Sequence, residues 1–253
     1  AYMGVTSATR GTFDPARRLC GMTKDQARGM DQPVGNDQSV ANDDALDDPR
    51  PPAYSAGPVR HRGAYLEMLI SALIGLIAAF VLSVEALTLA ENPLADLGCD
   101  INSVLSCGTV GQSWQASLLG FPNAYLGLIA EPVVITLAVA ALGGVRFPRW
   151  FMLSAQAVYF IGFAFAYWLF VQSFFVIGAL CPWCLTITVT TTLVFASITR
   201  VNLLDGNIRL SAKAYASVSS WLRAGADTLI VILILAVLTA MIVIKYGSVL
   251  FGG

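Results

Sequence analysis

The sequence predicts an all-α membrane protein with five transmembrane helices, and three observations support that class. Of the 253 residues, 56% are hydrophobic and only 12% are charged, whereas a soluble domain carries about 25% charged residues. Five segments are apolar over the roughly 20 residues that a helix needs to cross the hydrocarbon core of a bilayer. The charged residues lie mostly in the N-terminal stretch and in the connections between these segments. A net charge of −1 does not indicate nucleic-acid binding, and we expect no nucleic-acid partner.

The chain begins with a polar stretch, residues 1–63, which is rich in Gly, Asp, Pro and Asn and has no apolar periodicity. Such a composition cannot bury enough surface to order itself. We therefore predict a disordered cytoplasmic tail that acts as a tether, with a regulatory role as the alternative. Cys20 lies in this tail, where a free thiol is expected.

The five predicted spans determine how the rest of the chain is organised. They cover residues 65–90, 123–142, 150–170, 182–198 and 226–244. The block 150–199 has no charged residue but is about twice one span, so the chain must turn back near Cys181 and Pro182.

These spans predict a domain organisation in three parts after the tail. A four-helix bundle occupies residues 64–200 and carries an outer loop at 91–122. A cytoplasmic loop follows at 201–225, and the fifth helix and C-terminus occupy 226–253. We expect the cytoplasmic loop to be a plain connection with an aromatic anchor, and an amphipathic interfacial helix is the alternative.

The orientation follows from the Lys and Arg residues, which are in excess in short cytoplasmic loops. Basic residues precede the first span and lie between spans two and three and between spans four and five, whereas the loop 91–121 contains none. We therefore predict an N-terminus inside, a C-terminus outside, and a multi-pass protein of the plasma (inner) membrane. The first outer loop and the turn at Cys181 would both face the extracytoplasmic side.

Four of the five cysteines, Cys99, Cys107, Cys181 and Cys184, fall on this predicted outer side, where disulfides persist. Cys181 and Cys184 form a CxxC at a predicted helix start, where the helix dipole favours the thiolate. We expect Cys181 to be the more exposed thiol and Cys184 to lie one turn into the membrane, suited to a lipid-soluble electron carrier. Redox catalysis is the preferred interpretation; a zinc site and a pair of structural disulfides are the alternatives.

The single histidine excludes several enzyme classes. His61 lies before the first span, in a basic stretch on the predicted cytoplasmic side. The outer face therefore lacks the histidines that haem ligation, a Ser-His-Asp hydrolase or a zinc protease requires.

The pattern of motifs resembles the vitamin K epoxide reductase family, in particular its bacterial disulfide-forming branch without a fused thioredoxin domain. The similarity extends over about residues 66–200. The matching pieces are Cys99-Asp100, Ser106-Cys107, Val110, Ser113, the stretch 120–124 with Gly127, and Cys181-Pro182-Trp183-Cys184. The chain has Thr188 where mammalian members carry a tyrosine, so the resemblance does not extend to epoxide specificity.

This resemblance implies a four-helix bundle around a quinone pocket and a direction of electron flow. Cys99 and Cys107 would exchange disulfide with a thioredoxin-like (DsbA-like) protein on the outer face, expected to be a separate protein. Cys107 would relay to Cys181, and Cys184 would face a membrane quinone of the menaquinone or ubiquinone type. The activity would drive disulfide formation in exported proteins. The alternatives are a vitamin K quinone or epoxide reductase and a non-enzymatic, disulfide-stapled membrane scaffold.

The family's quinone pocket also uses a loop serine and an asparagine, which here match Ser113 and Asn123. Asn123 would donate a hydrogen bond to a quinone carbonyl or, alternatively, cap the second span. Glu131, followed by Pro132, lies within the second span, where an ionisable group is costly and a functional candidate. We expect it to deliver a proton to the quinone or to bond the carbonyl freed by Pro132. Glu85 lies nearer the outer surface and is expected to snorkel or to face the loop.

Overall fold

The computed structural model describes residues 61–251, so Cys20 and all but the last three residues of the predicted tail lie outside the described residues. Nine helical elements follow one another along this part of the chain: α1 (Arg62–Glu91), α2 (Cys107–Gly111), the 3₁₀ helix η3 (Trp114–Ser117), α3 (Ala124–Leu142), α4 (Arg149–Val171), the π-helix η4 (Gln172–Ile177), α5 (Pro182–Leu204), α6 (Ala212–Arg223) and α7 (Ala226–Phe251). Across residues 61–251 the backbone forms no β-strand, and only one isolated parallel bridge joins Leu105 to Leu180. The predicted all-α class is confirmed.

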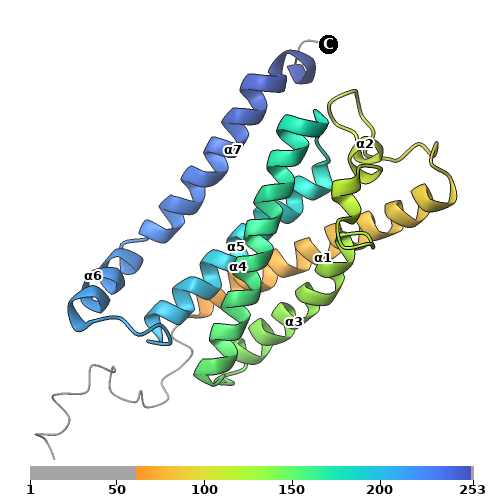
Figure 1. Cartoon of the computed structure of the whole chain (residues 1–253). Coiled ribbons are helices and arrows are strands. Elements are labelled where there is room, and N and C mark those ends of the chain that lie inside the picture. The colour runs from red at the N-terminus through yellow and green to blue at the C-terminus, as the bar shows by residue number, and fades with distance from the viewer. Residues whose placement is uncertain (1–60, 252–253) are drawn as a thin grey trace, which may run out of the picture. The chain divides into compact units, whose positions relative to one another are not determined.

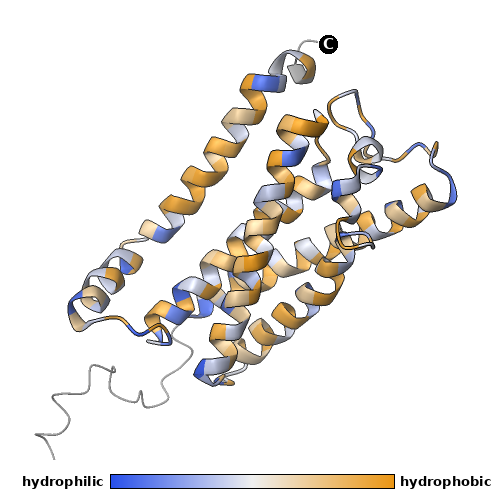
Figure 2. Ribbon diagram, in the orientation of Figure 1, coloured by the Kyte–Doolittle hydropathy of each residue, from blue (hydrophilic) through white to orange (hydrophobic). Residues whose placement is uncertain are grey.

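Five of these helices are long and apolar enough to cross a membrane, which confirms the predicted number of spans. Hydrophobic residues predominate along the ribbons of α1, α3, α4, α5 and α7, while most hydrophilic residues lie near the helix ends and in the connections (Figure 2). Two helices extend well beyond their predicted spans: α7 continues to Phe251 and α5 to Leu204. Arg200, inside the extension of α5, is paired with Asp227 of α7 at 2.8 Å. The direction in which the chain crosses the membrane remains a prediction from its charges.

Helix α1 is the centre of a four-helix bundle, because it packs against both α3 and α5, and α4 packs against α5 (Figure 1). The contact between α1 and α3 depends on small residues. A Cβ added at Gly127 would lie 2.7 Å from the Cβ of Ala79, so α3 approaches α1 more closely here than any other residue allows. Small residues permit this kind of close helix contact in membranes.

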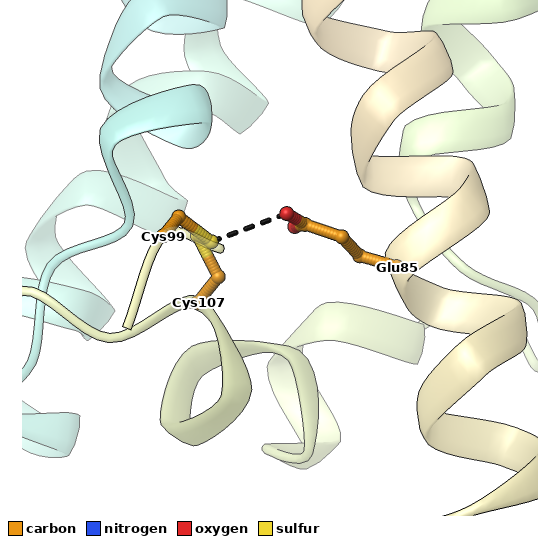
Figure 3. Close-up of side chains that lie close together, drawn as sticks. All are labelled: Glu85, Cys99 and Cys107. Carbon is orange, nitrogen blue, oxygen red and sulfur yellow. Dashed lines mark hydrogen bonds between the residues drawn. A yellow bond between two sulfur atoms is a disulfide. The ribbon is translucent and has the colours of Figure 1, made fainter. Parts of the chain in front are cut away.

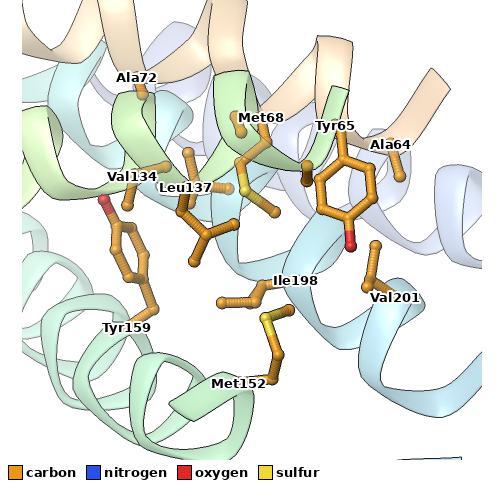
Figure 4. Close-up of a cluster of buried hydrophobic side chains, with 13 residues drawn as sticks. Ala64, Tyr65, Met68, Ala72, Val134, Leu137, Met152, Tyr159, Ile198 and Val201 are labelled. Carbon is orange, nitrogen blue, oxygen red and sulfur yellow. The ribbon is translucent and has the colours of Figure 1, made fainter. Parts of the chain in front are cut away.

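One end of the bundle is filled by a cluster of buried apolar side chains from α1, α3, α4 and α5 (Figure 4). Met68, Val194 and Ile198 have no exposed surface at all. These side chains interdigitate across the bundle axis, and dispersion contacts among them stabilise this end.

The last two helices lie outside the bundle. α6 is an amphipathic helix whose first turn is capped by Ser211, so within the predicted cytoplasmic loop the helical alternative is the one observed. Only 6% of the apolar window of α7 is buried, against 44% of that of α5. Most of α7 is therefore free to face lipid. Its contacts with the bundle are made with α5, including the Arg200–Asp227 pair, and with η4, where the Tyr246 hydroxyl donates to the carbonyl of Phe174.

Candidate active site

The CxxC begins α5, as predicted. The π-helix η4 ends at Gly178, whose φ of 75° is in the left-handed region that favours glycine, and the chain then reaches Cys181 in extended conformation. Cys181 is the N-cap, Pro182 occupies the first helical turn, and the N–H of Cys184 donates to the Cys181 sulfur at 3.4 Å. Proline is suited to this position because it has no N–H to leave unpaired.

A short backbone bridge joins the outer loop to the turn before α5. The N–H of Leu180 donates to the carbonyl of Val104 at 2.7 Å, and the N–H of Ser106 donates to the carbonyl of Leu180 at 3.0 Å. Cys181 follows Leu180 directly, and Cys107 follows Ser106, the last loop residue that is bonded across the bridge. The bridge therefore brings these two cysteines together, although they are 74 residues apart in the chain.

The sulfur atoms are arranged for thiol–disulfide exchange. Cys99 and Cys107 form a disulfide (Figure 3), while Cys181 and Cys184 are free thiols. The Cys181 sulfur lies 3.1 Å from the Cys107 sulfur. Disulfides exchange through attack of a thiolate on one of the two sulfurs, and this contact directs Cys181 to the Cys107 side of the bond.

The prediction that Cys181 is the more exposed thiol is wrong. Cys181 is only 2% exposed, because the outer loop carrying Cys107 covers the start of α5, whereas Cys184 is half-buried. A hydrogen bond from the Cys184 thiol, with those from the backbone N–H groups of Cys184 and Trp183, lowers the pKa of Cys181 in spite of its burial. The predicted thiolate character therefore stands, but its causes are these local bonds.

Asp100, next to Cys99 in the outer loop, holds the loop against the first turn of α2. Its carboxylate accepts from the N–H of Gly108 at 3.0 Å and from the N–H of Leu97 at 3.4 Å. Burial acts to raise the pKa of Asp100, but these bonds and those from Ser106 and Cys107 outweigh it and lower the pKa. A Cβ at Gly108 would lie 2.9 Å from an Asp100 oxygen, so the close approach requires glycine.

Glu85 of α1 faces the loop, which is one of the two predicted alternatives. Its Oε1 lies 3.2 Å from the Cys99 sulfur, as the dashed line in Figure 3 shows. The possible ligand atoms of Glu85, Cys99 and Cys107 lie within 4.8 Å of one another. The two sulfurs are bonded to each other, however, and so do not offer the pair of thiolates that a zinc site requires.

A cavity of about 920 Å³ opens beside the cysteines, inside the four-helix bundle. Its lining is mainly apolar and includes six of the seven predicted site residues: Cys107, Ser113, Asn123, Glu131, Cys181 and Cys184. Cys99 is not among them, because it lies on the far side of Cys107. The volume is in the range of pockets that bind small organic molecules, and the apolar lining suits a lipid-soluble one.

Ser113 and Asn123 lie in the wall of this cavity, and neither caps a helix through its side chain. The Ser113 hydroxyl donates to the carbonyl of Val110 at 2.6 Å. The Asn123 amide donates to the carbonyl of Gln115 at 2.6 Å, but its Oδ1 is buried without a partner. The capping alternative for Asn123 is therefore wrong, and its oxygen is available to accept a hydrogen bond from a bound ligand.

Glu131 is buried and accepts a hydrogen bond from the hydroxyl of Tyr159 at 3.2 Å. Its hydrogen-bond partner is thus a side chain of α4. The alternative prediction, a bond to the backbone carbonyl freed by Pro132, is wrong. Nothing in the sequence singled out Tyr159, since α4 contains many aromatic residues without a distinguishing motif. Thr188 also lines the cavity, and its hydroxyl donates to the carbonyl of Cys184.

The bundle and its cysteines agree with a comparison with known families. The model of the vitamin K epoxide reductase family matches residues 66–199. The chain belongs to this family. No curated protein matches the chain. Membership in the vitamin K epoxide reductase family identifies a multi-pass membrane oxidoreductase, and implies quinone-linked redox chemistry on disulfides; family members generally use quinones.

Proposed function

We propose that the protein passes electrons from a thioredoxin-like protein on the extracytoplasmic face, through Cys99/Cys107 and then Cys181/Cys184, to a membrane quinone of the menaquinone or ubiquinone type. The observation that carries the proposal is the 3.1 Å contact between Cys107 and Cys181. It connects the loop disulfide to the pair that faces the cavity, and so supports one continuous route for two electrons. The net result would be disulfide formation in exported proteins.

The route begins with the partner's thiolate, which attacks the Cys99 sulfur, breaks the loop disulfide and releases Cys107 as a thiolate. The partner's second thiol then attacks its own mixed disulfide and frees Cys99. The partner leaves oxidised, and the loop pair has gained two electrons. Because Cys99 is only 6% exposed, the outer loop must open for the partner to reach it.

The relay follows in two exchanges. The Cys107 thiolate attacks Cys181 in an oxidised Cys181–Cys184 pair, and Cys184 leaves as a thiolate. Cys99 then attacks Cys107, re-forms the loop disulfide and releases Cys181. The observed state, with the loop disulfide closed and the Cys181 thiol 3.1 Å from Cys107, is the arrangement expected at the end of this relay.

The cavity residues fit the electron acceptor. A bound quinone supplies the final oxidation of Cys181/Cys184 by accepting two electrons and two protons. Cys181 and Cys184 both line the cavity, and Cys184 is the less buried of the two, which supports its role as the sulfur that faces the acceptor. The second N–H of the Asn123 amide would donate to a quinone carbonyl, and its unpaired Oδ1 would accept from the hydroxyl of the reduced product. Ser113 would have to turn its hydroxyl from the carbonyl of Val110 to donate to the acceptor, and Glu131 would hold a proton in the cavity wall.

A direct experiment uses the purified chain, a reduced thioredoxin-like protein and a soluble short-chain quinone. We expect the quinone absorbance to decay and Cys184→Ser to abolish the decay, while Cys20→Ser, a cysteine remote from the site in sequence, has no effect. Full quinone reduction by the Cys184→Ser variant would overturn the mechanism. Reduction of a vitamin K epoxide at a comparable rate would instead favour the epoxide reductase alternative, and no reduction by the unaltered chain would favour the scaffold.

A further inference from the structure

Glu85 has no role in the exchange steps above, yet it touches one of the reacting sulfurs. Its Oε1 lies 3.2 Å from the Cys99 sulfur, and its Oε2 is buried without a hydrogen-bond partner among residues 61–251 (Figure 3). A buried carboxyl oxygen without a partner costs free energy. The disulfide sulfur has no proton to donate in the observed state, so the contact is not a conventional hydrogen bond. The position of Glu85 therefore suits a state in which Cys99 carries a proton.

Cys99 must change its protonation state in every turnover. It is released by the partner, becomes a thiol, and must be a thiolate again to attack Cys107. An ordinary cysteine thiol has a pKa of about 8.5, and apolar surroundings raise it further. The cluster around Cys99 contains Leu89, Leu97 and Val110. Without a base, Cys99 would therefore be a thiolate in only a small fraction of the protein molecules at neutral pH.

Besides Asp100, the stretch 91–122 carries two further carboxylates, Glu91 and Asp96, and both are exposed to solvent, whereas Cys99 is buried. Residues 91–122 contain no Lys, Arg or His, and the Asp100 carboxylate is already bonded to the N–H groups of Gly108 and Leu97. The titratable groups that face Glu85 from the packed elements are Asp100, Cys99, Cys181 and Cys184. Among these, Glu85 is the carboxyl group in contact with the sulfur that must lose its proton.

We propose that Glu85 is the general base for Cys99: it takes the thiol proton as Cys99 attacks Cys107, and returns that proton when the partner releases Cys99. The step balances, because one proton moves from Cys99 Sγ to a Glu85 oxygen, the Cys99–Cys107 bond forms, and the Cys107–Cys181 bond breaks. Cys181 leaves with the electron pair. The place of this step in turnover rests on the proposed function.

The proton transfer also assists the leaving group. An ionised Glu85 raises the pKa of Cys181, although local hydrogen bonds outweigh it. When Glu85 accepts the Cys99 proton, its carboxylate becomes neutral. The negative charge that forms on Cys181 is then no longer repelled by a negative charge on Glu85. One carboxyl group thus activates the attacking sulfur and favours the departing one.

The test isolates the loop pair in the full chain. Cys20, Cys181 and Cys184 are replaced by Ser, the loop pair is reduced, and one equivalent of the aromatic disulfide dithiobis(nitrobenzoate) is added between pH 6 and pH 9. The first aryl thiolate is released when the reagent reacts with one loop thiol, and the second when the loop disulfide closes. The rate of the second release measures closure without a quinone or a partner protein.

With Glu85 present, we expect the closure rate to vary little between pH 6 and pH 8. Glu85→Gln should slow closure about 100-fold at pH 6, with the difference shrinking towards pH 9 as solvent ionises the thiols. Glu85→Asp, which keeps the carboxyl group, should restore part of the rate. Glu91→Gln, at the exposed end of the same helix, is the matched control and should follow the unaltered loop.

A Glu85→Gln variant that closes at the unaltered rate, or that is slowed by one constant factor at every pH, overturns the inference, because a structural support would produce a constant factor. If Glu85→Gln does not fold, the pH profile of the protein that retains Glu85 provides the test. A closure rate that rises tenfold per pH unit from pH 6 to pH 8 excludes a general base, because it would mean that solvent alone ionises the attacking thiol. A chain that fails to reduce a quinone but closes its loop in a Glu85-dependent manner overturns the proposed function and supports this inference.

Discussion

At the end of the bundle where α1 begins, Met68, Met152 and Ile198 fill the space between the helices, whereas at the cysteine end the same helices enclose a cavity of about 920 Å³. Packing stabilises the first end. At the second, a disulfide and one backbone bridge hold the loop over the helices. The difference shows how one bundle combines a packed end, which supplies stability, with an open end whose cavity wall includes the unpaired oxygens of Glu85 and Asn123.

The largest effect should appear when the reactive end is reduced to two cysteines. Cys99→Ser with Cys184→Ser, on a Cys20→Ser background, leaves Cys107 and Cys181, whose sulfurs lie 3.1 Å apart. Their approach to the bonding distance of about 2.05 Å is short, so we expect mild oxidation to link them in most molecules. Peptide mass spectrometry without reduction measures the link. Cys99→Ser with Cys181→Ser is the matched control, and equal cross-linking in both pairs would contradict the relay geometry.

The packed end should respond through stability. Met68 has no exposed surface, so Met68→Ala should remove about 2–5 kcal/mol from the free energy of unfolding and leave the exchange rate of the folded protein unchanged. Leu119→Ala, at a half-exposed position in the cavity wall, should cost about 0.5 kcal/mol or less. Retention of the monodisperse protein after heating provides the measurement. Equal losses in the two variants would mean that the two ends are packed alike.

Glu131 lies between the two ends, and its replacement tests how far the reactive chemistry extends into the bundle. If Glu131 supplies a proton in the cavity, Glu131→Gln should slow quinone turnover about tenfold or more, whereas Tyr159→Phe, which keeps the carboxyl group but removes its partner, should slow it less. The decay of quinone absorbance with dithiothreitol as the electron donor measures both. A fast Glu131→Gln variant together with a slow Tyr159→Phe variant would assign the pair a purely structural role.

The smallest expected effect concerns Asp100, which holds the outer loop in place through its hydrogen bonds. The lowered pKa of Asp100 means that its ionised form stabilises the folded loop; this contribution is present above a pH of about 4 and is lost as the pH falls through the lowered value. Asp100→Asn should therefore increase amide exchange at residues 107–111 severalfold at pH 7. The unaltered chain should approach the variant near pH 3. Exchange that differs equally at both pH values would assign the effect to shape and not to charge.

Sequence reasoning predicted the class, the five spans and the turn at Cys181, because hydropathy and charge are properties of short segments. The resemblance supplied Ser113 and Asn123, and both lie in the cavity wall. The burial of Cys181 and the Glu131–Tyr159 contact could not be predicted in the same way. Each depends on how two distant elements pack, and the single bridge between Leu105 and Leu180 leaves no periodic pattern in the sequence.

That bridge also determines where the chain tolerates changes of length. An extended residue advances the backbone by about 3.3 Å, which exceeds the 3.1 Å gap between Cys107 and Cys181. One residue inserted between the bridge and either cysteine would carry the sulfur out of reach, whereas an insertion at 95–96, before the Leu97 N–H that binds Asp100, would lengthen only the approach to the disulfide. For protein engineering, an added epitope or reporter belongs in the first part of the loop. The spacing from Leu105 to Cys107 and from Leu180 to Cys181 must be kept, because it sets the distance between the two sulfurs.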